Sequence, residues 1–116
     1  MVAALTSGIP FWNLGDKFTK DFRTEYPEIS PYNADRKLQN FRKAYIGMRW
    51  AYWQIDRTRA GLSISVDNKV KTVSDPAEIS GLDAQADKAH QAYDRALSRY
   101  TGKKVKTDRP EPYLGE

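Results

Sequence analysis

Apolar residues recur at helical spacing through the middle of the chain. The series alternates steps of four and three residues and consists of Ala34, Leu38, Phe41, Tyr45, Met48, Tyr52 and Ile55. Such a heptad pattern places its members on one face of an α-helix. Ser30-Pro31 or Asn33 can cap the start, and Gly61 is a stop signal. The pattern therefore predicts a long helix over about residues 32–60.

A second apolar series has the same period and smaller residues. It consists of Ile79, Leu82, Ala86, Ala89, Tyr93, Ala96 and Tyr100. Asp75-Pro76 before it is typical of a helix start, and Gly102 after it is typical of a helix end. The series predicts a helix over about 76–101. Because short connections make consecutive helices antiparallel, and bulky residues fit against small ones, the two segments predict an antiparallel helical hairpin.

A third stripe precedes the hairpin. Its aromatic and aliphatic members are Phe11, Leu14, Phe18, Phe22 and Tyr26. Prolines at positions 10 and 27 suit the two boundaries, so the stripe predicts a shorter amphipathic helix over about 10–26. This helix either packs across its own hairpin or docks on a partner, and the sequence leaves both alternatives open.

The remaining segments lack helical periodicity. In the inter-helix segment 61–75, Leu62, Ile64 and Val66 alternate with polar residues before the turn signal Asp67-Asn68, so we expect a short β-hairpin or an extended loop. We expect an N-terminal arm over 1–9 and an extended tail over 103–116. The predicted fold is a single small all-α domain spanning 1–116.

Composition removes several kinds of chemistry. The 116 residues include no cysteine and one histidine, His90, so disulfides and zinc–thiolate sites are excluded. The sequence contains no phosphate-binding loop, nucleophile elbow or metalloprotease motif. We therefore expect a non-catalytic protein with no cofactor and no metal. The start of the chain lacks the pattern of a secretory signal, and no apolar run is long enough to cross a membrane. Peripheral membrane contact by the first helix stays open.

Charge points to macromolecular partners. Nineteen basic and fifteen acidic residues give a formal net charge of +4, and the two signs are interspersed along the chain. This pattern favours other protein subunits as partners and makes nucleic acid the second choice. For nucleic acid, the candidate residues are Arg36, Lys37, Arg42, Lys43, Arg49, Arg57 and Arg59, with Trp50 and Trp53 among them.

One tryptophan lies off the predicted seam. At about 100° per residue, Trp50 points about 130° from the centre of the seam, beyond the reach of the second long helix. Tryptophan is enriched where interfaces concentrate binding energy. We therefore predict a protein-binding surface at Trp50, Ile46 and Trp53, with Phe11, Trp12 and Tyr113 as further contact residues.

Size and composition suggest a function by analogy. Small, basic, cysteine-free helical chains with extended arms resemble the accessory subunits of organellar assemblies, although no motif supports the resemblance. We expect a non-catalytic structural subunit of a large multiprotein assembly, such as a mitochondrial respiratory-chain complex or the ATP synthase. A ribosome-associated or other RNA-binding protein is the alternative. The expected location is intracellular and, on the same analogy, mitochondrial.

Overall fold

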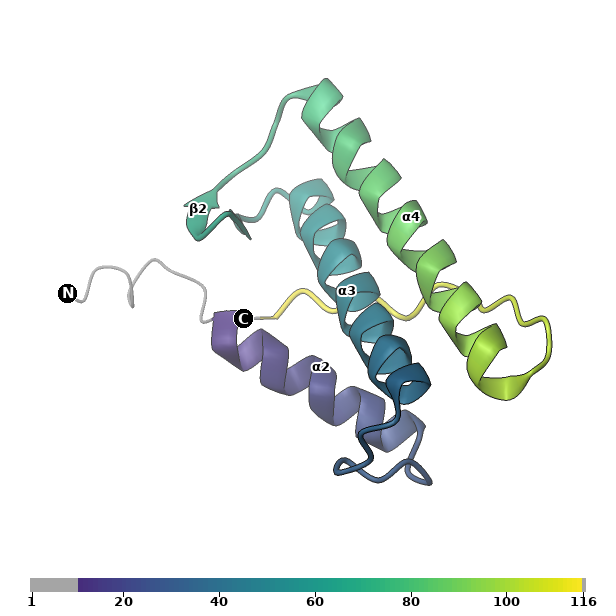
Figure 1. Ribbon diagram of the computed structural model, residues 1–116. Helices are drawn as coiled ribbons and strands as arrows, with labels where there is room; N and C mark the ends of the chain where they lie inside the picture. Colours follow the sequence, from purple (N-terminus) through teal and green to yellow (C-terminus); the bar gives the residue numbers. More distant parts are fainter. Residues whose placement is uncertain (1–10, 116) are drawn as a thin grey trace.

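The computed structural model describes residues 11–115, with side chains from Leu14 onward. The described part contains three helices and one two-stranded antiparallel sheet (Figure 1). Their order along the chain is α2 (Phe11–Glu25), α3 (Arg36–Arg59), β1 (Ile64–Val66), β2 (Lys69–Lys71) and α4 (Pro76–Thr101). The predicted arm over 1–9 lies outside the described residues. No helix in the described part is long and apolar enough to cross a membrane.

Helix α3 forms the centre of the molecule, and its apolar seam is buried. Every member of the predicted series from Leu38 to Ile55 is buried. Ala34 is exposed and precedes the helix, because Asp35 is the N-cap and accepts a hydrogen bond from the Lys37 amide at 2.8 Å. The predicted caps Ser30 and Asn33 are therefore wrong. They belong to the loop that leads into the helix.

Helix α4 runs antiparallel to α3 and packs along it (Figure 1). The predicted start and stop are confirmed: Asp75 caps the helix, and Gly102 ends it in the left-handed region at φ 75°. The small residues of α4 let Phe41 of α3 approach closely. Its ring stacks between Tyr93 and Tyr100, with ring centroids 5.6 and 5.2 Å away. The predicted volume match therefore describes the contact between the two helices.

Helix α2 packs on its own hairpin, which resolves the alternative that the sequence leaves open. Leu14, Phe18 and Phe22 are buried. The Phe22 ring meets Phe41 edge-on at 5.3 Å, so the aromatic residues of α2 join the core between α3 and α4. Burial of this stripe against apolar neighbours supplies the driving force that helix propensity alone does not, since Gly15 weakens the segment.

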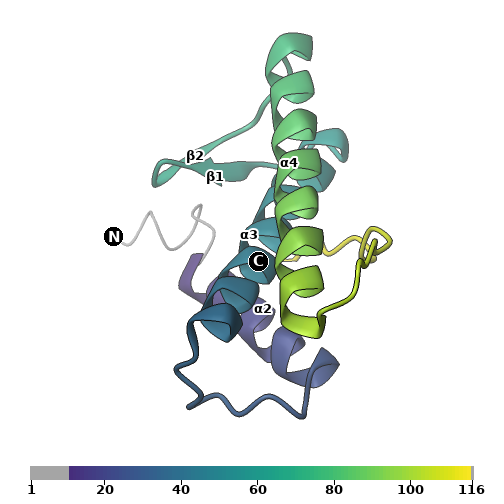
Figure 2. The same cartoon turned by 45° about the vertical axis from the view of Figure 1, so that its right-hand side comes forward.

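The segment between α3 and α4 makes the fold mostly helical and not strictly all-α. Strands β1 and β2 pair in register, with Ile64 opposite Lys71. Asp67 and Asn68 have positive φ angles of 51° and 64°, which is the geometry of a tight two-residue hairpin turn. The Ile64 side chain is completely buried against α3 and α2. Figure 2 shows this hairpin projecting on one side of the helices, opposite the start of the tail.

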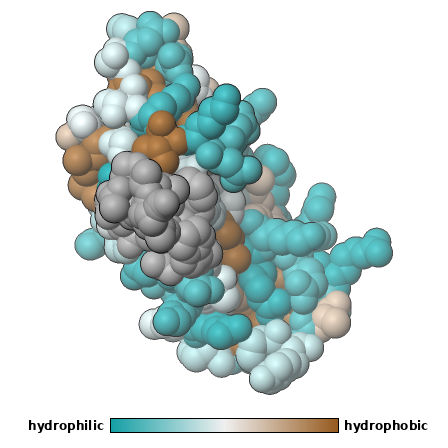
Figure 3. Space-filling model, turned by 90° about the vertical axis from the view of Figure 1, so that its left-hand side faces the viewer, coloured by the Kyte–Doolittle hydropathy of each residue, from teal (hydrophilic) through white to brown (hydrophobic). Residues whose placement is uncertain are grey.

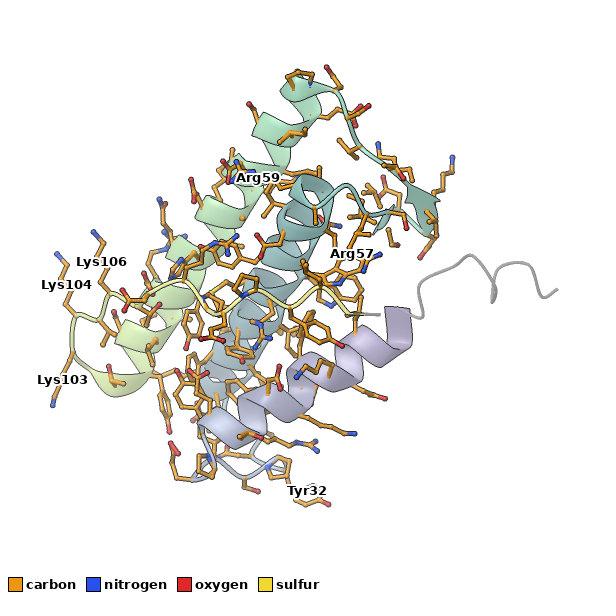
Figure 4. The ribbon with its side chains drawn as sticks, turned by 180° about the vertical axis from the view of Figure 1, so that it is seen from behind. Tyr32, Arg57, Arg59, Lys103, Lys104 and Lys106 are labelled. Atoms are coloured by element: carbon orange, nitrogen blue, oxygen red, sulfur yellow. The ribbon has the colours of Figure 1, made fainter. Side chains whose placement is uncertain are left out.

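Residues 103–115 are extended, but they lie against their own chain. The indole N–H of Trp53 donates to the Gly115 carbonyl at 2.8 Å, and the Arg57 guanidinium donates to the Leu114 carbonyl. The guanidinium of Arg109 forms an ion pair with Asp56. Figure 4, seen from behind, shows the tail crossing α3 toward the start of α2. The tail therefore covers the face of α3 that neither α2 nor α4 reaches.

Candidate functional site

The tryptophans of the predicted protein-binding surface contact the core of this chain. Trp50 is half-buried, and its ring meets Phe18 of α2 at 6.0 Å and Trp53 at 5.6 Å, both edge-on. Trp53 is 1% exposed, so it has almost no surface to offer to a partner. Ile46 is half-buried and packs between the two apolar clusters of the molecule. The intrachain alternative thus accounts for most of this surface.

The other predicted contact residues lie near the start of α2. Tyr113 is half-buried, with its ring 6.2 Å from Phe18 and the Lys17 ammonium 4.9 Å above it. Phe11 and Trp12 begin α2, but their side chains lie outside the described part. Protein binding by this set stays a prediction.

Most of the arginines proposed for nucleic acid are engaged within the fold. Arg49 pairs with Asp21 at 2.9 Å, and Arg59 pairs with Asp83 at 2.8 Å. Arg57 is 4% exposed, and its Nε donates to the Ser63 carbonyl at 2.7 Å. Figure 4 shows Arg57 inside the molecule and Arg59 beside α4. Arg36, Lys37 and Lys43 are exposed. Nucleic-acid binding by this candidate set stays a prediction.

The antiparallel packing brings the basic start of α3 beside the basic end of α4. Between them lies an open hollow of about 440 Å³. Its walls consist of Asp35, Arg36, Lys37 and Asn40 from α3, and Ala96 and Arg99 from α4. Asp35 is already used as the helix cap, so its carboxylate is satisfied by backbone amide. The free charge facing this hollow is therefore positive.

A second hollow, of about 700 Å³, lies on the other side of Arg99. Its walls consist of Gln91, Asp94, Arg95, Ser98 and Arg99 from α4, and Lys104, Val105 and Lys106 from the tail. Figure 4 shows Lys103, Lys104 and Lys106 projecting outward beside the end of α4. Because Arg99 borders both hollows, the two form one continuous surface, which we call the basic end: Arg36, Lys37, Arg95, Arg99, Lys104 and Lys106.

The tail lysines are held in place by the backbone around them. The Ser98 hydroxyl accepts the Val105 amide at 2.8 Å, so the loop is tied to α4 between the two lysines that line the hollow. The amide and the hydroxyl of Thr107 both donate to Asp94, at 3.1 and 2.6 Å. These bonds also occupy the Asp94 carboxylate. The loop therefore presents its lysines from a fixed backbone.

The only histidine of the sequence belongs to the same hydrogen-bond network that holds the tail loop in place. His90 Nδ1 lies 2.6 Å from the Tyr52 hydroxyl, and Nε2 lies 2.9 Å from the Thr107 hydroxyl. Burial raises the pKa of Tyr52, which keeps this phenol a neutral hydrogen-bonding group. Both ring nitrogens thus have partners within the fold. Among the described residues, no group of histidines and carboxylates is arranged to hold a metal ion.

The basic end concentrates the net charge of the protein. Within the described part of the chain, none of its six cations has a side-chain hydrogen bond or an ion pair. Six cations and the carboxylates of Asp35 and Asp94 give +4, which equals the formal net charge of the whole chain. The remaining charges therefore balance each other, and the interspersed pattern of the sequence becomes a segregated one in space.

Comparison with known proteins adds no relative. No protein-family model, no curated protein and no solved structure shows a significant match to this chain. The functional argument therefore depends on the geometry and charge of the basic end.

Proposed function

We propose that this protein is a non-catalytic nucleic-acid-binding protein that engages its partner through the basic end. One observation supports the proposal: cations from α3, α4 and the tail converge around two adjoining hollows without intramolecular partners. Phosphate groups are the natural partners for such cations, because each contact releases condensed counterions. Sequence alone ranks a protein partner first because the charges are interspersed, and their gathering in space reverses that order.

Surface apolarity argues against a membrane as the partner. Binding to a bilayer surface combines cations with inserted apolar side chains. The exposed large apolar residues of the described part are Tyr32, Leu62, Val70 and Leu114. Of these, only Tyr32 lies near the basic end, whereas Leu62 precedes β1 and Val70 lies in β2, at the other end of the molecule. Figure 3 shows a different face of the molecule, the side from which the β-hairpin projects, where hydrophobic side chains gather mainly in the upper part.

The first test is salt-dependent binding of the full chain to RNA. If six phosphates are contacted, the logarithm of the association constant should fall with the logarithm of salt concentration with a slope of about −4 for a single strand. The double variant Arg99→Gln, Lys104→Gln should reduce the steepness by about 1.4. The matched control is Lys69→Gln, which removes an exposed lysine of β2 and should leave the slope unchanged.

Three outcomes would count against the proposal. If the full chain does not bind RNA at about 50 mM salt, the proposal is wrong. A double variant that binds like the parent places the contact elsewhere on the surface. Binding only to vesicles with anionic lipids, or only to acidic peptides, assigns the basic end to a different class of partner.

Membership of a larger assembly is a second proposal and is compatible with the first, because a nucleoprotein particle also contains accessory subunits. The partly exposed ring of Trp50 supports it, since tryptophan is enriched at interfaces. Co-purification of the tagged protein, with identification of its partners, tests this proposal. Fractionation of the source cells tests the mitochondrial location. Recovery of the protein as a free monomer removes the assembly proposal and leaves nucleic-acid binding unaffected.

A further inference from the structure

We infer that the basic end is built for single-stranded nucleic acid, with a base in each hollow and the sugar–phosphate backbone passing over Arg99. This inference rests on the proposed nucleic-acid binding and specifies the form of the ligand. It starts from the shape of the surface, which consists of two adjoining hollows of about 700 and 440 Å³ with one arginine between them.

The concave shape fits an unpaired strand better than a duplex. A duplex hides its bases, and proteins that read it insert a helix or a β-ribbon into a groove about 12 or 6 Å wide. The cations of the basic end line two open hollows. Hollows of a few hundred Å³ suit drug-sized groups, which include a nucleoside. A strand with splayed bases can place such groups there, whereas a duplex cannot.

The walls of the hollows offer surfaces for flat bases as well as charges for phosphates. Arg95 and Arg99 present guanidinium planes, on which bases stack. Val105 in the larger hollow and Ala96 in the smaller one add apolar contact. The aliphatic stems of Lys104 and Lys106 extend this apolar lining while their ammonium groups remain in water. Each hollow therefore combines a stacking surface with phosphate-binding cations.

An exposed aromatic residue continues the path beyond the smaller hollow. Tyr32 is 92% exposed and lies three residues before Asp35, so its Cα is within about 11 Å of that residue. Figure 4 shows its ring pointing away from the molecule. The Tyr32 amide donates to the Ser30 hydroxyl at 3.2 Å, and Arg42 donates to the Ser30 carbonyl at 3.3 Å, which ties this turn to α3. Tyr32 is thus positioned to stack on a base of the same strand.

The experiment compares two nucleic acids of equal charge. Fluorescence anisotropy measures the affinity of the full chain for a labelled single-stranded oligouridylate of about ten nucleotides and for an RNA hairpin with the same number of phosphates. We expect the single strand to bind at least tenfold more tightly. Arg99→Lys keeps the charge and removes the planar group, so it should weaken single-strand binding roughly 5- to 150-fold without changing the salt slope.

Two further variants separate stacking from folding. Tyr32→Ala should weaken single-strand binding about as strongly as Arg99→Lys, whereas Tyr32→Phe should bind like the parent because it retains the ring. Arg99 and Tyr32 are exposed, so all three variants should melt at the parent temperature. Lys69→Gln is again the control for charge.

The outcomes distinguish this inference from the proposal on which it rests. Equal or tighter binding of the hairpin overturns the single-strand inference but keeps nucleic-acid binding. The same holds if Arg99→Lys and Tyr32→Ala both bind the single strand like the parent. Failure of both nucleic acids to bind in a salt-dependent manner overturns the nucleic-acid proposal itself.

Discussion

Phe41 lies where the three helices meet, so its removal should destabilise the whole fold. The side chain is completely buried, and its ring has four aromatic neighbours. The ring centroids lie 5.3 Å from Phe22, 4.9 Å from Tyr26, 5.6 Å from Tyr93 and 5.2 Å from Tyr100. Phe41→Ala removes the buried ring and leaves a cavity, which costs about 3–5 kcal/mol in the free energy of unfolding. Aromatic pairs contribute about 0.5–1.5 kcal/mol each beyond area burial, so we expect the upper end of that range.

This loss is large compared with the stability of the protein. A chain of 116 residues is stable by about 6–17 kcal/mol, so Phe41→Ala removes a substantial fraction. Phe41→Leu keeps an apolar side chain and should cost clearly less, about 1–2 kcal/mol. Urea unfolding followed by tryptophan fluorescence measures both changes. Tyr32→Ala, at an exposed site, should stay within about 0.5 kcal/mol of the parent. A loss below about 1 kcal/mol for Phe41→Ala would show that α2, α3 and α4 do not meet at this ring.

Three further predictions concern other parts of the core. Trp50→Ala should lower the free energy of unfolding of the isolated protein by about 1–3 kcal/mol, because the ring packs on Phe18 and Trp53; an unchanged urea midpoint would assign Trp50 to an interface alone. Ala89→Leu should cost about 1–3 kcal/mol, since Ala89 packs against the core, and a melting temperature equal to that of the parent would contradict this contact. Burial raises the pKa of Tyr26 from its usual 10 to about 12, so the folded state favours the neutral phenol. Stability from this group should be complete below pH 10 and should decline as the pH rises through 12, a decline that Tyr26→Phe should reduce in unfolding experiments.

Heptad spacing predicts the helical pair because burial follows it residue by residue in α3, whereas in α4 the buried Leu97 lies outside the predicted series. Phe41, Tyr45 and Met48 are recognisable as seam residues from their positions alone. The start of α3 is harder to predict, because Ser30, Asn33 and Asp35 are all residues that cap helices. Only the actual backbone path decides among them, and it assigns the cap to Asp35.

The basic end could be predicted only in part, because its residues are distant in sequence. The lysines near residue 104 form a visible cluster after the second long helix, and Arg36-Lys37 is visible at the start of the first long helix. Their proximity depends on the antiparallel packing of α3 and α4, with Arg99 between them. Conversely, Arg49 and Arg57 look like exposed cations in the sequence. In the fold, Arg49 pairs with the carboxylate of Asp21, and Arg57 donates a hydrogen bond to the Leu114 carbonyl. Both partners are distant in the sequence.

The tail also leaves no periodic signal, since it is attached through single hydrogen bonds and not through a repeating face. Its partners Trp53, Asp56 and Arg57 lie on two successive turns of α3 and supply one contact each. A residue pattern with period two or 3.6 cannot encode such attachment. This is why the sequence indicates an extended tail but not the surface on which it lies.

The attachment of the tail has a consequence during protein synthesis. The residues that satisfy Trp53 and Arg57 are translated more than fifty positions after them. A nascent chain that already contains all three helices therefore still has an indole N–H without its acceptor and an uncovered face on α3. Until translation has passed Gly115, this face is open to water and to other chains, so the protein is exposed to premature association during that period.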